Sequence, residues 1–151
     1  MSEADRYEQF TKELETKYPE MYHNVYCGIS IDEGWFQIIR SLSDQLYHHV
    51  KHNNDRRAKL LIDNRYNQEI PEELMYPEVH QIKEKFGGLR FYADYTDDFA
   101  YGAICLAEEW AVNTCEVCGK PGKIREGGWI KVLCDEHEAK RQERMKGRFN
   151  D

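Results

Sequence analysis

Residues 115–119 read CEVCG and residues 134–137 read CDEH, and these two short stretches decide the C-terminal part of the fold. They supply two closely spaced ligand pairs with fifteen residues between them, namely Cys115, Cys118, Cys134 and His137. Four such ligands can close a tetrahedron around one Zn²⁺ and leave no coordination position for a reacting water. The sequence therefore predicts a structural zinc site, with unmetallated core cysteines as the alternative.

The residues around these ligands are typical of a treble-clef zinc finger. Gly119 directly follows the second cysteine and provides the permissive φ angle that a tight knuckle needs. Residues 123–125 and 129–133 are short candidate strands, and a Gly-Gly pair between them predicts a hairpin. The second ligand pair opens residues 135–148, which are rich in helix formers. Knuckle, hairpin and helix in this order predict a zinc module over residues 115–151.

The composition fits one compact domain, or one domain plus a zinc module. The chain has 151 residues, of which 40% are hydrophobic and 13% aromatic, enough for a core. No run approaches the roughly 18 apolar residues of a membrane span, and the N-terminus lacks the hydrophobic region of a signal peptide. Cys27 and Cys105 lie outside the ligand set. Isolated thiols beside a thiolate zinc site are typical of a reducing cytoplasm, so we expect a cytoplasmic protein.

Charge is distributed unevenly along the chain. The net charge is −7, yet residues 115–151 carry nine Lys/Arg against seven Asp/Glu, and residues 1–114 carry twelve against twenty-one. An acidic body disfavours nonspecific duplex binding, because that affinity depends on neutralising phosphates. The chain also lacks a Walker loop, a nucleophile elbow and a His-Glu-x-x-His motif. These observations favour a binding protein over an enzyme, without excluding an enzyme.

Residues 1–114 are predicted to form an α+β body of helices around a β-hairpin. Apolar residues recur at helical spacing over residues 2–17 and 32–52, and a further helical piece is expected at 55–61. Residues 62–77 are expected to form an irregular connection, which is either a lid or a surface excursion.

Another helix is predicted to begin at Asp97 or Asp98. Its apolar positions at helical spacing, expected to be buried, are Phe99, Ala103, Leu106 and Trp110. No flexible Gly/Ser linker precedes Cys115, so we expect the zinc module to pack on the body.

Residues 79–95, VHQIKEKFGGLRFYADY, predict the central β-hairpin. With the Gly-Gly pair as a two-residue loop, the facing pairs are Phe86–Leu89, Glu84–Phe91 and Ile82–Ala93. This register places the apolar residues on one face, toward the core. Glu84 is an acidic residue on that otherwise apolar face. Its carboxylate is expected either to pair with an arginine or to lie at the edge of a pocket.

The opposite face of the hairpin gathers three cations and an aromatic residue, Lys83, Lys85, Arg90 and Tyr92. Cations beside a planar aromatic ring suit an anionic, ring-bearing ligand such as a nucleotide. Trp35 or Tyr95 would complete such a ligand-binding site. The alternative is a solvated face whose cations pair with nearby acids.

The string KEKFGGLRFY, the Gly34-Trp-Phe helix start and the closing CEVCG…GGW…LCDEH resemble a family of short uncharacterised proteins from phages, prophages and bacteria. The resemblance covers roughly residues 25–138 and brings no established activity with it. It implies an accessory role, such as countering a host defence or capturing a signalling nucleotide.

Three functions follow from these features. The first is a non-enzymatic, zinc-stabilised protein that sequesters an anionic small ligand. The second is an adaptor whose acidic body binds and inhibits a host protein. The third, a treble-clef nucleic-acid binder or nuclease, is disfavoured because no histidine lies between Cys118 and Cys134 to serve as a general base. The sequence leaves homo-oligomerisation open.

Overall fold

The computed structural model describes residues 1–149 and confirms an α+β fold. In chain order the elements are α1 (Glu3–Lys17), α2 (Pro19–Tyr22), β1 (Ile29–Ser30), the 3₁₀ helix η1 (Glu33–Trp35), α3 (Phe36–Ile62), β2 (Glu78–Lys85), β3 (Gly88–Asp94), α4 (Asp98–Ala111), β4 (Lys123–Arg125), β5 (Lys131–Leu133) and α5 (Asp135–Phe149). Within residues 1–149, no helix combines the length and the apolar character needed to cross a bilayer.

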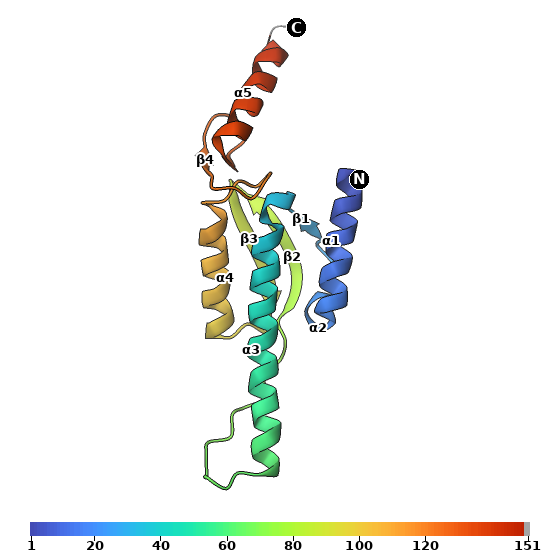
Figure 1. The fold of residues 1–151 in the computed structure, drawn as a ribbon, viewed down its shortest axis with the longest axis vertical. Helices are drawn as coiled ribbons and strands as arrows, with labels where there is room; N and C mark the ends of the chain where they lie inside the picture. The colour runs from blue at the N-terminus through green and yellow to red at the C-terminus, as the bar shows by residue number, and fades with distance from the viewer. Residues whose placement is uncertain (150–151) are drawn as a thin grey trace.

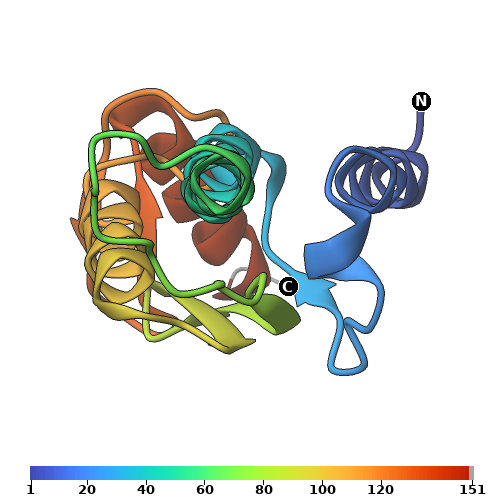
Figure 2. The same ribbon diagram turned by 90° about the horizontal axis from the view of Figure 1, so that it is seen from below.

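The body consists of a three-stranded sheet with helices on one of its faces. The strand order is β1-β2-β3, with β1 parallel to β2 and β2 antiparallel to β3. Helices α3 and α4 lie side by side over the sheet, and α1 and α2 lie on the β1 side (Figures 1 and 2). Figure 2 shows no helix of residues 1–149 across the opposite face of the sheet. That face is therefore available to a ligand.

The core lies between the sheet and these helices. Its fully buried side chains come from every part of the body and include Leu14, Met21, Trp35, Ile39, Leu46, Ile82 and Leu89. Val132 of β5 belongs to the same cluster, so the C-terminal module shares its apolar contacts with the body.

Helix α3 is longer than the sequence predicts. We expected it to end near His52, because Asn53 and Asn54 are poor helix formers, yet the helix continues to Ile62. The side chains of both asparagines instead bond the backbone of the connection that follows: Asn53 Nδ2 donates to the carbonyl of Glu72, and Asn54 exchanges two bonds with Leu74. These tertiary partners stop the amides from competing for the helix backbone.

The hairpin turn is shifted by one residue from the predicted position. Its two turn residues are Phe86 and Gly87, with φ angles of +52° and +77°, as a type I′ turn requires. The Glu84 carboxylate accepts a hydrogen bond from the Gly87 amide at 2.6 Å. This bond explains why an acid lies on the inward face. Because of this shift, each β2 residue near the turn faces the β3 residue two positions before its predicted partner. Ile82, for example, faces Phe91 instead of Ala93, and both Ile82 and Phe91 remain buried. Phe86, however, is 75% exposed and not in the core.

The predicted buried stripe of α4 is wrong for Phe99, Leu106 and Trp110, which are exposed, whereas Ala103 is partly buried against the core. The side chains that pack into the core are Ala100, Ala107 and Ala111. Small residues predominate on this face because α4 packs against both β3 and α3, and the larger Ile104 packs at the margin of the same core. Phe99, Leu106 and Trp110 lie on its more exposed side.

Candidate metal centre and hairpin surface

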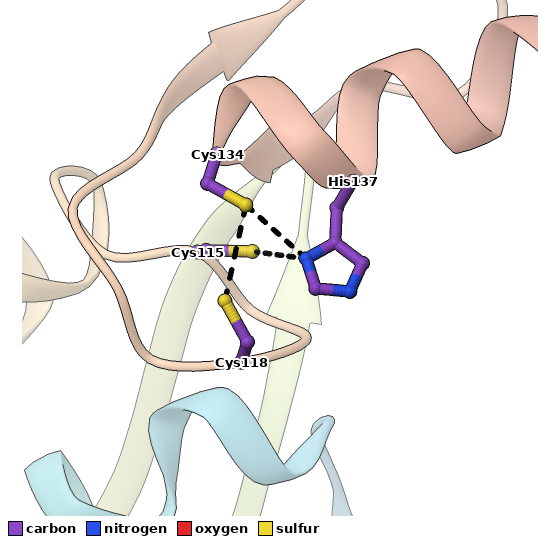
Figure 3. Close-up of side chains that lie close together, drawn as sticks. All are labelled: Cys115, Cys118, Cys134 and His137. Carbon is purple, nitrogen blue, oxygen red and sulfur yellow. Dashed lines mark hydrogen bonds between the residues drawn. The ribbon is translucent and has the colours of Figure 1, made fainter.

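The four predicted ligands converge at the junction of the knuckle and α5 (Figure 3). Their donor atoms all lie within 4.8 Å of one another. The Nδ1 atom of His137 is 3.2 Å from Cys134 Sγ and 3.7 Å from Cys115 Sγ, and the thiols of Cys118 and Cys134 are 3.8 Å apart. A cluster with this donor set and spacing can hold a metal ion.

Local backbone structure orients the ligands. The Gly119 amide donates to the carbonyl of Cys115 at 2.9 Å, and the φ angle of +79° at this glycine closes the knuckle as predicted. The first turn of α5 presents the backbone N–H of His137 to the Cys134 sulfur. This hydrogen bond, with the donors and thiols around it, lowers the pKa of Cys134 to about 6, so the ligand is a thiolate at neutral pH.

The module is joined to the body at the start of α3. The Gly34 amide donates to the carbonyl of Glu116, and the Trp35 indole N–H donates to the carbonyl of Thr114, both at 2.9 Å. Glu116 is itself buried and pairs with Lys131 at 2.9 Å. Burial raises the pKa of this carboxyl. The junction therefore combines backbone pairing with a buried ion pair beside the ligands.

The predicted cations lie together on the helix-free face of the sheet. Lys83 and Arg90 face each other directly across β2 and β3. On the same face, Lys85 lies two residues from Lys83 toward the turn, and Tyr92 lies two residues from Arg90 away from the turn. Within residues 1–149, none of the three cations forms a salt bridge. Like charges facing each other across strands are unfavourable without a counter-ion. This face therefore favours an anion.

Two of the residues predicted to complete this site lie elsewhere. Trp35 is fully buried and its indole N–H is already bonded, so it is not available for stacking on a ligand. Tyr95 lines a small cavity with Leu46 and Val50 of α3, which places it on the helix-covered side of the sheet. Both positions were suggested by residue type alone. The fold places Trp35 in the core and Tyr95 on the side of the sheet opposite to the cations.

The structure adds two aromatic residues to the hairpin face that sequence reasoning missed. The ring of His80 stacks near Tyr92, with centroids 6.2 Å apart, and Tyr26 stacks on His80 at 5.5 Å. A break in the β2–β3 register between Val79 and Gln81 makes this arrangement possible, because it turns Val79 inward and leaves His80 on the open face. Nothing in the sequence signals this bulge. We call Tyr26, His80 and Tyr92 the aromatic row.

A cavity of about 680 Å³ lies elsewhere, between α1, the C-terminal module and α5. Its lining mixes acids of the N-terminal region, such as Glu33, with arginines of α5, such as Arg144, and includes the metal ligand His137. None of the predicted ligand-binding residues lines it. The hairpin face is thus an open surface and not a preformed pocket.

The fold and the cluster define an α+β protein with a Cys₃His site able to bind a metal ion. Comparison with protein-family models, with curated proteins and with solved structures gives no match. The resemblance to phage proteins therefore stays a prediction.

Proposed function

We propose that this is a non-enzymatic binding protein, braced by structural Zn²⁺, whose hairpin face captures an anionic, ring-bearing ligand of the nucleotide class. The choice of zinc rests on the donor set and its spacing. Tetrahedral zinc with Zn–S of about 2.3 Å and Zn–N of about 2.0 Å separates two sulfurs by about 3.8 Å, and a sulfur from a nitrogen by about 3.5 Å. The distances of 3.8, 3.7 and 3.2 Å in the cluster are close to these values.

The observation that carries the ligand proposal is the unpaired, directly opposed pair Lys83 and Arg90 beside the aromatic row. Arg90 and Tyr92 are two residues apart on one strand, roughly 7 Å along it. That span is comparable to the span from the phosphate to the base of one nucleotide. A phosphate on the cations would leave the base over the ring of Tyr92, and both contacts are favourable.

Because the face is open, we expect modest affinity that weakens as salt concentration rises. Calorimetry against linear and cyclic mono- and dinucleotides tests the proposal. Arg90→Ala and Tyr92→Ala should each weaken binding at least about tenfold. Lys12→Ala is the matched control, because it removes an exposed cation on α1. No heat with any nucleotide, or equal losses in the control, would contradict the proposal.

The other functions predicted from the sequence stay predictions. An acidic body that binds a host protein needs no feature of the hairpin, and pull-downs with charge-reversed variants would test it. The proposed signalling nucleotide of a phage accessory role rests on the family resemblance alone. Metal-dependent cleavage of DNA or RNA would support the nuclease alternative.

A further inference from the structure

Helix α4 presents an apolar stripe to solvent. Phe99 is 46% exposed, Leu106 71% and Trp110 45%, and the partly buried Ala103 lies between them. At 100° per residue these four side chains fall within roughly 60° of one another around the helix. They lie about a quarter-turn from the alanines that pack into the core. The helix lies at one edge of the molecule in both views (Figures 1 and 2). The exposed fractions of Phe99, Leu106 and Trp110 leave the stripe accessible to another chain. We call Phe99, Ala103, Leu106 and Trp110 the α4 stripe.

We infer that the α4 stripe is the contact surface of a homodimer in which two copies of α4 pack antiparallel about a twofold axis. The order of side chains along the stripe is self-complementary in this arrangement. With the axis midway between Ala103 and Leu106, Phe99 meets Trp110 of the second copy, and Ala103 meets Leu106. Large aromatic residues then pack together, and each leucine fits against a small residue. A twofold interface requires this kind of self-complementarity.

The area of the stripe is appropriate for a reversible dimer. Large apolar side chains have on the order of 150–250 Å² each, so the exposed fractions of Phe99, Leu106 and Trp110 leave on the order of 300 Å² of apolar surface per copy. A standard interface buries roughly 800 Å² per partner, a little over half of it apolar. The stripe supplies most of that apolar area. We therefore expect a dimer that dissociates at low micromolar concentration and not an obligate one.

The charges that border the stripe give the orientation a distinct signature. Asp98 and Glu109 lie on the same edge of the stripe by helical position, and both are exposed. In the antiparallel pair, Glu109 of one copy lies near Asp98 of the other. Wild-type dimers then have like charges at the rim, and Glu109→Lys replaces each repulsion with an ion pair. In a parallel pair the two copies of residue 109 lie on opposite sides of the interface, so the same substitution would create no such ion pair.

Sedimentation equilibrium of the metal-loaded protein over a range of concentrations tests the inference. Leu106→Glu should raise the dimer dissociation constant at least about tenfold, because association would bury an unpaired carboxylate. Tyr101→Glu is the matched control: Tyr101 is 68% exposed on the same helix but lies roughly half a turn away from the stripe. Glu109→Lys should lower the dissociation constant about two- to fivefold, the modest gain of a surface ion pair.

The outcomes separate the alternatives. A protein that remains monomeric into the high-micromolar range would overturn the dimer and leave the stripe as a docking site for a different protein. Equal weakening by Leu106→Glu and Tyr101→Glu would also overturn it. Weakening by Leu106→Glu together with unchanged or weaker association of Glu109→Lys would overturn the antiparallel arrangement. Circular dichroism of each variant establishes that the fold is retained, which both exposed positions should allow.

Discussion

Gly34→Ala should separate the C-terminal module from the body. A Cβ at this position would lie 2.2 Å from the carbonyl oxygen of Cys115 and 2.5 Å from the carbonyl carbon of Glu116. Both neighbours are backbone atoms, so neither can move aside by a rotamer change. Relief requires the module to shift by about 1 Å, because ordinary non-bonded carbon contacts are about 3.5 Å or more.

The expected loss of stability follows from what that shift breaks. The hydrogen bonds from the Gly34 amide to Glu116 and from the Trp35 indole to Thr114 are each worth about 1 kcal/mol. Overpacking adds about 1–3 kcal/mol. We therefore expect the free energy of unfolding to fall by about 3–5 kcal/mol. Because Cys115 moves with its carbonyl, the variant should also lose its metal faster to a chelator.

Urea unfolding followed by tryptophan fluorescence measures the first effect, and a colorimetric chelator measures the second. Gly147→Ala is the matched control, since nothing lies within 4 Å of a Cβ at this helical glycine. It should change stability by no more than about 1 kcal/mol, in the stabilising direction. If Gly34→Ala unfolds within about 0.5 kcal/mol of the wild type, then the module is not docked as described.

Three further perturbations have defined outcomes. Metal chelation or Cys118→Ser should remove the circular dichroism of α5 while that of α3 and α4 persists, and an unchanged spectrum and midpoint would contradict a structural role for the ion. Burial holds the pKa of Tyr22 above its ordinary value of 10.0. Above about pH 10 the unfolded chain loses the Tyr22 proton while the folded protein keeps it, so the free energy of unfolding falls as pH rises. Tyr22→Phe should therefore make this fall less steep in alkaline unfolding experiments. A slope equal to that of the wild type would argue against the buried hydroxyl. Gly87→Ala should cost about 1–2 kcal/mol in urea unfolding, because its φ of +77° disfavours a side chain, and a neutral result would argue against the type I′ turn.

Features encoded over a few residues could be predicted from the sequence. The four metal ligands come in local pairs, and the glycine after Cys118 closes the knuckle whatever surrounds it, so ligand identity followed from spacing. Alternation along β2 and β3 likewise predicted that the three hairpin cations share one face. The turn lies one residue from its predicted position, but this changes each cross-strand partner near the turn by two residues and so leaves the three cations on their predicted face.

Tertiary structure alone decided which apolar groups are buried and what lies beside the cations. The periodicity of α4 contains two apolar faces, one of alanines and one of larger residues, and only close packing on α3 and β3 selects the alanines. The length of α3 depends on side-chain bonds from Asn53 and Asn54 to a segment about twenty residues later. The aromatic row depends on a bulge at His80 and on a loop distant in sequence. These outcomes arise from contacts between segments, which neither local propensity nor spacing encodes.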